Sequence, residues 1–136
     1  MSGAAPQALA RVPLFAELEE HELAQLAGAF KERRFQPGEV MIQKGSGAAA
    51  FFVIDTGEAS VVVDGTERRV LGPGDYCGEL ALIDAGARTA TVTAASDLVC
   101  WGVTFWDFRP LVEANGAIAW KLLQSLMEIY RAERVA

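Results

Sequence analysis

The first clear hydrophobic pattern lies between Glu17 and Phe30, where Leu23, Leu26 and Ala27 recur with Phe30 at the spacing of one helical face. Glutamates gather at the start of this stretch, and negative side chains at a helix N-terminus interact favourably with the helix dipole. The pattern therefore predicts an amphipathic helix that begins among glutamates and buries its leucines.

Beyond Phe30, short runs of β-branched and aromatic residues alternate with turn residues. The expected strands are residues 39–43, 51–55, 59–64, 67–71, 89–94 and 98–103. Between two of them, Asp64 and Gly65 form the clearest hairpin turn. Many short strands separated by frequent turns predict an antiparallel barrel or jelly roll.

The strand pattern ends at Val103, and a short helix is expected directly after it. Thr104, with Asp107 three residues later, resembles a capping box. Pro110 is expected to limit the length of this helix, because proline lacks the backbone N–H that continues the hydrogen-bond pattern.

Residues 117–134 predict one long terminal helix, because they contain no proline or glycine and follow a break at Asn115 and Gly116. One apolar stripe of this helix consists of Ala119, Leu122, Leu126 and Ile129. The adjacent apolar stripe consists of Trp120, Leu123, Met127 and Tyr130. The remaining polar strip consists of Lys121, Gln124, Ser125, Glu128 and Arg131. The two stripes offer more apolar surface than packing on one side of a barrel requires.

The composition limits the class of protein and its partners. A chain of 136 residues with 51% hydrophobic residues is long enough for one domain with a substantial core. The net charge of -6 argues against DNA or an anionic membrane as a partner. Cys77 and Cys100 are too far apart for a metal or redox motif and too few for a disulfide framework. With no secretion signal or membrane span in the sequence, a cytoplasmic location is expected.

Two charged side chains, Glu79 and Arg88, stand out in the otherwise apolar stretch Gly78–Val92. One interpretation is a salt bridge that holds a loop on the barrel. The other is an anion site, in which Gly78 permits a tight turn and a single helical turn after it offers free N–H groups. The guanidinium of Arg88 would then bind the anion, and the carboxylate of Glu79 would accept a hydrogen bond from a sugar hydroxyl. Phosphate and sugar together indicate a nucleotide.

The segment GPGDYCGELALIDAGARTATVTA, residues 72–94, resembles the phosphate-binding cassette of the cyclic nucleotide-binding domains. These domains occur in bacterial catabolite-activator-type regulators, kinase regulatory subunits and cyclic nucleotide-gated channels. VPLFAELEEHELAQLA resembles the N-terminal helical lead-in of the family, and FQPGEVMIQKG and FFVIDTGEASV resemble its early strands.

The resemblance implies a mainly β fold with flanking α-helices: a jelly-roll-like antiparallel β-roll of about eight strands, with N-terminal helices and a long C-terminal lid helix. The expected single domain covers residues 1–136, with the helical lead-in at about 6–30, the β-roll at about 31–103 and the C-terminal helices at about 104–134.

The resemblance also implies a role for the charged pair. Glu79 would accept a hydrogen bond from the ribose 2′-hydroxyl, and Arg88 would pair with the cyclic phosphate. Thr89 would contact the phosphate or the base, which does not decide between cyclic AMP and cyclic GMP. The implied ligand-binding residues are Gly78, Glu79, Leu80, Ala81, Arg88, Thr89 and Ala90.

Two positions depart from the pattern of the family. Cys77 stands where an aromatic residue is usual, and Ala87 replaces the common proline before the arginine. Cys77 is interpreted either as a thiol that modulates the pocket or as a small buried filler. Neither change removes a charge that would contact the ligand.

The expected function is therefore a ligand-responsive regulatory module that binds cyclic AMP, with cyclic GMP as a second candidate, and that carries no DNA-binding or catalytic domain of its own. Binding would shift the terminal helix between open and closed positions. Trp120, Leu123, Met127 and Tyr130 are the candidate lid residues; they would cover the base, pair with a second subunit in a homodimer, or belong to the core.

Two other classes of function are compatible with a β-roll of this size. One is a domain of the same fold that acts through an unidentified effector protein without any ligand; the presence of both Glu79 and Arg88 favours ligand binding instead. The other is a jelly-roll metal enzyme. His21 is the only histidine and is expected to be a solvated residue on an acidic helix, so we expect no metal and no catalytic residues.

Overall fold

The computed structural model describes residues 6–43, 50–78 and 90–134 of the chain. The helical segments before the strands are α1 (Pro6–Leu9), the 3-10 helix η1 (Pro13–Phe15) and α2 (Glu20–Ala27). The strands are β1 (Lys31–Phe35), β2 (Val40–Ile42), β3 (Ala50–Thr56), β4 (Ala59–Val63), β5 (Thr66–Leu71), β6 (Tyr76–Cys77), β7 (Thr91–Ala94) and β8 (Leu98–Thr104). The helices α3 (Phe105–Glu113) and α4 (Gly116–Arg134) follow them.

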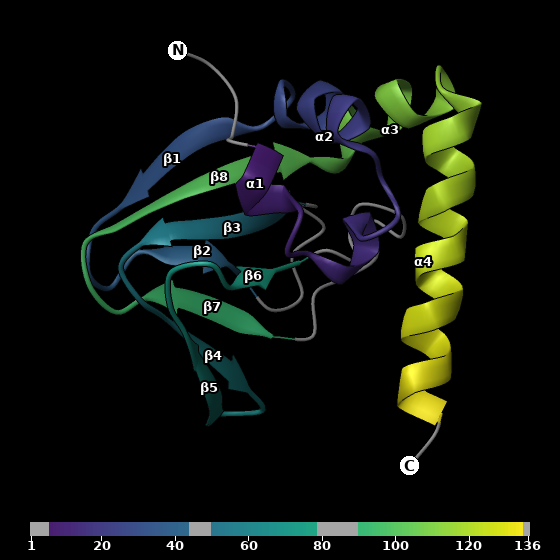
Figure 1. The fold of residues 1–136 in the computed structure, drawn as a ribbon. Coiled ribbons are helices and arrows are strands. Elements are labelled where there is room, and N and C mark those ends of the chain that lie inside the picture. The colour runs from purple at the N-terminus through teal and green to yellow at the C-terminus, as the bar shows by residue number, and fades with distance from the viewer. Residues whose placement is uncertain (1–5, 44–49, 79–89, 135–136) are drawn as a thin grey trace.

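The strands form two four-stranded sheets, in the orders β1-β8-β3-β6 and β2-β7-β4-β5. All of the strand pairs are antiparallel. Helices α2 and α3 lie at one end of the group of strands, and α4 runs along one side of it (Figure 1). This arrangement confirms the expected antiparallel β-roll with helices before and after it.

The core consists of two clusters of buried side chains that meet at β3. Along a strand, successive side chains point to opposite faces of the sheet, so Phe51 and Val53 enter one cluster while Phe52 and Ile54 enter the other. The first, which we name the helical cluster, consists of Leu9, Val12, Leu14, Phe15, Leu18, Leu23, Leu26, Ala27, Phe30, Phe51, Val53, Val103, Phe108, Ile118 and Leu122. The second, the roll cluster, consists of Phe35, Ile42, Phe52, Ile54, Ala59, Leu71, Val92, Ala94, Leu98 and Cys100.

The hairpin turn between β4 and β5 has the geometry that its sequence predicts. Asp64 has a φ of 52° and Gly65 a φ of 78°, and a two-residue turn with positive φ at both positions matches the twist of the strands that it joins. Val63 and Thr66 are paired directly across this turn. The Asp-Gly signal was therefore sufficient to locate the hairpin.

The boundaries of the first long helix differ from the expected stretch Glu17–Phe30. Helix α2 begins at Glu20, because Glu19 and Glu22 form a reciprocal capping box at its N-terminus. The helix ends at Ala27, before the chain enters β1. His21 is 75% exposed, as expected, and its Nδ1 lies 3.5 Å from the carboxylate of Glu19.

Helix α3 confirms the expected cap and corrects the expected effect of its proline. The Oγ1 of Thr104 accepts a hydrogen bond from the backbone N–H of Asp107 at 3.1 Å. The helix nevertheless runs through Pro110 and ends at Glu113. Pro110 has no backbone N–H to pair with the carbonyl group one turn earlier in the helix. Because this side of the helix is exposed at Pro110, that carbonyl group can turn toward solvent. Within the described ranges, no helix is both long enough and apolar enough to cross a lipid bilayer.

Candidate functional site

The predicted ligand-binding residues fall between β6 and β7. Gly78 and Ala90 are described by the structure, and both are half-buried. Glu79, Leu80, Ala81, Arg88 and Thr89 lie outside the described residues. The candidate site is therefore defined here by the elements on either side of it.

These two strands belong to different sheets. In β6, Tyr76 is paired with Val53 and Cys77 with Phe52 of β3, in the first sheet. In β7, Thr91 is paired with Val62 of β4, in the second sheet. The chain thus passes from one sheet to the other between residue 78 and residue 90, at a position where both ends are held by strand pairing.

Gly78 has a φ of 85°, which a residue with a side chain adopts only with strain. It directly follows β6, so the extended backbone conformation ends at this glycine, where the strand pairing with β3 ends. The sequence predicts a tight turn before Glu79 for the same reason; the positive φ of Gly78 is compatible with such a turn, which stays a prediction because Glu79 lies outside the described residues.

The interior next to these two ends is apolar. Cys77 directly precedes Gly78, and Val61 is paired with Val92 of β7; both side chains are partly buried and pack against the roll cluster. An apolar wall beside the candidate site suits a ligand with a flat, weakly polar part. The packing of Cys77 supports its interpretation as a small filler.

The second cysteine, Cys100, has a structural role. It lies on β8, fully buried within the roll cluster. Burial raises the pKa of its thiol to about 12, against the opposing influence of the Arg33 guanidinium. Cys100 is therefore a protonated, unreactive thiol at neutral pH. Within the part of the chain that the structure describes, no three His, Cys, Asp or Glu residues lie close enough together to hold a metal ion.

The candidate lid residues lie on the outer side of α4. Their exposed fractions are 64% for Trp120, 54% for Leu123, 48% for Met127 and 55% for Tyr130, so these four side chains do not belong to the described core. The helix packs instead on η1 and α3, through its other apolar stripe. Whether the outer stripe covers a ligand or a second subunit stays a prediction.

A groove between α3 and α4 is a feature that the sequence did not predict. Its volume is about 410 Å³, and its lining is mainly apolar. The apolar side chains that line the groove include Phe105, Phe108, Val112, Leu122, Leu123 and Leu126. Leu123 belongs both to the groove and to the outer stripe of α4, so the two form one continuous apolar surface.

Comparison with known proteins identifies the relatives of this chain. A family model described as the cyclic nucleotide-binding domain matches residues 32–115. The chain is 38% identical, over 66% of its length, to a cAMP-dependent protein kinase regulatory subunit from Emericella nidulans, of which it spans 22%. It is 36% identical, over 74% of its length, to a cGMP-dependent protein kinase from Plasmodium berghei, of which it spans 12%. The chain thus spans less than a quarter of either relative.

Two solved structures have the same fold. The N-terminal domain of a transcriptional regulator from Streptomyces coelicolor A3(2) matches with a TM-score of 0.85 at 26% identity, over 93% of this chain and 92% of that one. The catabolite activator protein of Thermus thermophilus matches with a TM-score of 0.70 at 26% identity, over 90% of this chain and 60% of that one.

Proposed function

The chain belongs to the cyclic nucleotide-binding domain family, and from this premise we propose that it binds a cyclic nucleotide and acts as a ligand-responsive regulatory module. The observation that carries the proposal is the family match itself, because residues 32–115 include the whole segment with Glu79 and Arg88. No catalysis is assigned to this chain.

The proposed chemistry divides the ligand between two charged side chains. Arg88 pairs with the cyclic phosphate through charge-assisted hydrogen bonds, and Glu79 accepts a hydrogen bond from the ribose 2′-hydroxyl. Backbone groups at Gly78, Leu80 and Ala81 add donors, while Thr89 and Ala90 lie beside the ligand. The positive φ of Gly78 and the apolar wall at Cys77 and Val61 support this assignment.

We propose cyclic AMP as the ligand, with cyclic GMP as the alternative. The two kinase relatives are named for different nucleotides, one for cAMP and the other for cGMP. A binding measurement therefore has to decide whether the base of the ligand is adenine or guanine. Calorimetric titration with cyclic AMP, cyclic GMP and linear AMP separates the three outcomes, because a site built for the cyclic phosphate binds linear AMP weakly or not at all.

The Arg88→Ala variant tests the site directly. Loss of a charged hydrogen-bond partner for the phosphate is expected to weaken cyclic AMP binding by about tenfold to a hundredfold. Arg68→Ala, on the exposed strand β5, is the matched control and should bind like the unaltered chain. Full affinity in Arg88→Ala, or equal losses in both variants, would remove the assignment.

A second candidate is a domain of the same fold that acts through protein contacts without a ligand. The exposed apolar surface formed by the groove and the outer stripe of α4 favours this candidate. It predicts no heat of binding, and no rise in melting temperature, with any of the three nucleotides.

The partners and the location are also proposals. We propose a homodimer through the C-terminal helix α4, an effector protein that responds to the closed form, and no DNA or membrane partner. A cytoplasmic location is consistent with Cys77 and Cys100, which both remain as thiols. The single-domain division of residues 1–136 is likewise proposed.

A further inference from the structure

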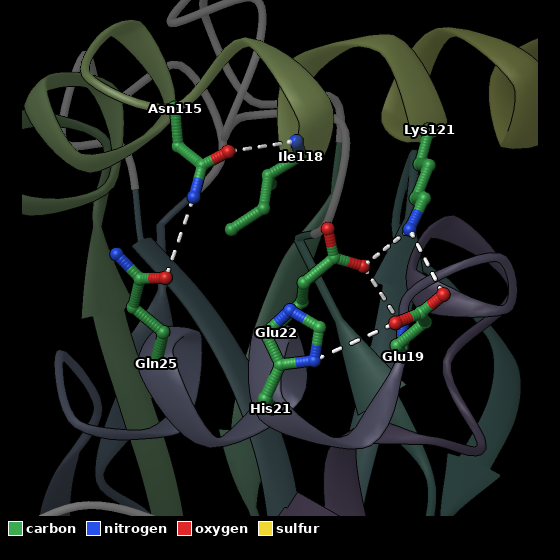
Figure 2. Close-up of polar contacts among 7 residues, drawn as sticks. All are labelled: Glu19, His21, Glu22, Gln25, Asn115, Ile118 and Lys121. Carbon is green, nitrogen blue, oxygen red and sulfur yellow. Dashed lines mark hydrogen bonds and ion pairs between the residues drawn. The ribbon is translucent and has the colours of Figure 1, made fainter.

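Helices α2 and α4 are joined by a polar contact between residues that are distant in sequence (Figure 2). The ammonium Nζ of Lys121 lies 2.7 Å from Oε1 of Glu22 and 3.8 Å from Oε2 of Glu19. The same Oε1 of Glu22 accepts a hydrogen bond from the backbone N–H of Glu19 at 2.9 Å. The hydrogen bond that Lys121 donates to Glu22 is the main cause of the lowered pKa of Glu22. The same hydrogen bond is the main cause of the raised pKa of Lys121.

The two partners of this ion pair are buried to different degrees. The side chain of Glu22 is 4% exposed, whereas that of Lys121 is 25% exposed. In the described ranges, Lys121 is the only cation within ion-pairing distance of Glu22. Removing Lys121 would therefore leave a buried carboxylate without a counter-charge, which is unfavourable unless α4 moves and water reaches Glu22.

A second polar contact holds the first turn of α4. The side-chain oxygen of Asn115 accepts a hydrogen bond from the backbone N–H of Ile118 at 3.1 Å and caps the helix. The amide group of Asn115 also donates to Gln25 of α2 at 3.4 Å. The beginning of α4 is thus attached to α2 at two places, Asn115 and Lys121.

The remainder of α4 has weaker attachments. Ser125 is 2% exposed, and its hydroxyl has no hydrogen-bond partner among the described residues. An unsatisfied buried hydroxyl makes this part of the contact unfavourable. Between residues 126 and 132, no side chain is fully buried. The fully buried contacts of α4 are therefore concentrated in its first half.

The attached side of α4 is opposite to its outer apolar stripe. Ile118, Leu122 and Ser125 are buried, and at 3.6 residues per turn they lie on the other side of the helix from Trp120, Met127 and Leu123. For the outer stripe to reach a ligand in the β-roll, α4 must turn or leave its contacts with η1 and α2. Either movement separates Lys121 from Glu22, because both the stripe and Lys121 belong to one rigid helix.

We propose that the Lys121–Glu22 ion pair is an autoinhibitory restraint, which holds α4 with its apolar stripe outward and breaks when the helix closes over a bound cyclic nucleotide. The closure step rests on the proposed function; the restraint itself does not. Because the buried carboxylate disfavours intermediate positions, α4 has two positions and no gradual movement between them. Weakening the restraint must then raise the affinity for the ligand.

Three variants test the restraint. Lys121→Met removes the counter-charge and should release α4. The double variant Glu22→Gln with Lys121→Met should keep α4 in place, because its glutamine retains the capping hydrogen bond and leaves no buried charge. Arg131→Met is the matched control, since Arg131 pairs with Glu128 at 2.9 Å on the same helix and both side chains are well exposed.

The first measurement is amide hydrogen exchange without ligand, read by mass spectrometry. In Lys121→Met, peptides of α4 should exchange faster while peptides of β3 and β8 stay protected. The double variant and Arg131→Met should match the unaltered chain. If α4 in Lys121→Met exchanges like the Arg131→Met control, or if β3 and β8 lose protection together with α4, the pair is not a restraint on α4.

The second measurement is the affinity for cyclic AMP by calorimetry. Lys121→Met should bind at least about fivefold more tightly than the unaltered chain, and the double variant should not. An unchanged or weaker affinity in a variant whose α4 is released would mean that the bound state keeps the ion pair, and would overturn the autoinhibitory role. If neither the unaltered chain nor any of the variants binds a cyclic nucleotide, the proposed function fails. The hydrogen-exchange data still decide whether the restraint exists.

Discussion

The helical cluster and the roll cluster share strands β3 and β8 but pack different elements against them. The helical cluster joins α1, η1, α2, α3 and α4 to one face of β3, so it determines where α4 lies. The roll cluster is built from strands and forms the interior beside the candidate site. The helix that is proposed to move and the strands that are proposed to bind the ligand therefore pack on opposite faces of β3.

Strand β6 is the clearest connection between the two clusters. Tyr76 packs against the helical cluster, while the next residue, Cys77, packs against the roll cluster. The ring of Phe51 lies 5.9 Å from the rings of Phe15 and Phe30 and 6.1 Å from that of Tyr76. Phe51 thus links the helices to the strand that leads into the candidate site.

The largest effect is expected from Phe51→Ala, which removes this link. Truncation of a fully buried phenylalanine typically costs about 3–5 kcal/mol of unfolding free energy, because the site cannot collapse around the smaller side chain. Chemical denaturation measures the loss. Val70→Ala, on an exposed strand position, is the control and should change stability by less than about 0.5 kcal/mol. A loss below 1 kcal/mol in Phe51→Ala would show that the two clusters are not coupled through this ring.

A smaller effect is expected at the junction where β8 ends and α3 begins. Thr104→Ala removes the capping hydrogen bond to Asp107 and should cost about 1 kcal/mol in the same denaturation experiment. Thr104→Ser retains a hydroxyl that accepts this bond and should restore most of the stability. Equal losses in both variants would point to the methyl group of the threonine and against the cap.

The smallest effect, confined to α4, is expected from pH. The pKa of Glu22 is lowered below its ordinary value of 4.5, so its contribution is complete above pH 4.5 and is lost as the pH falls through the lowered value. The pKa of Lys121 is raised above 10.5, so its contribution is complete below pH 10.5 and is lost above the raised value. Between these limits the attachment of α4 should not depend on either group.

Hydrogen exchange of α4, corrected for the intrinsic effect of pH, measures this window. In the unaltered chain, α4 should loosen in acid before the strands do. The double variant at Glu22 and Lys121 should lack this step, although it retains Glu17, Glu19 and His21 near the pair. An acid step of the same size in both proteins would assign the loosening to those neighbours.

Most of the strands that the sequence predicted have a buried, alternating or β-branched pattern; β5, which is almost fully exposed, follows the Asp64-Gly65 hairpin turn. The missed strands lack that pattern for physical reasons. In β1, only Phe35 is buried and the preceding four side chains are charged and exposed, so the strand is visible only through its pairing with β8. Strand β6 has two residues, too few for any periodicity. Pairing partners, and not local preference, make both segments into strands.

The faces of α4 show a similar limit. The sequence grouped Lys121 and Ser125 into one polar strip, yet Ser125 is buried and Lys121 pairs with a residue 99 positions away. Helical periodicity gives the arrangement of side chains around an axis, but it does not give the surface on which the helix lies. For the candidate site, the family resemblance supplied the roles of Glu79 and Arg88, and the described structure contributes the positive φ of Gly78 and the apolar residues beside the site.

The outer strands of the two sheets also limit how copies of this chain can aggregate. Strands β1 and β5 each lie at the end of a sheet, where unpaired backbone groups would accept a strand from another molecule. Both are lined with exposed charged side chains: Lys31, Glu32, Arg33, Arg34, Glu67, Arg68 and Arg69. Charge at an edge discourages the addition of another strand there. The opposite ends of the two sheets, β6 and β2, carry no charged side chains, so cross-β stacking between copies is expected to start at those edges and not at β1 or β5.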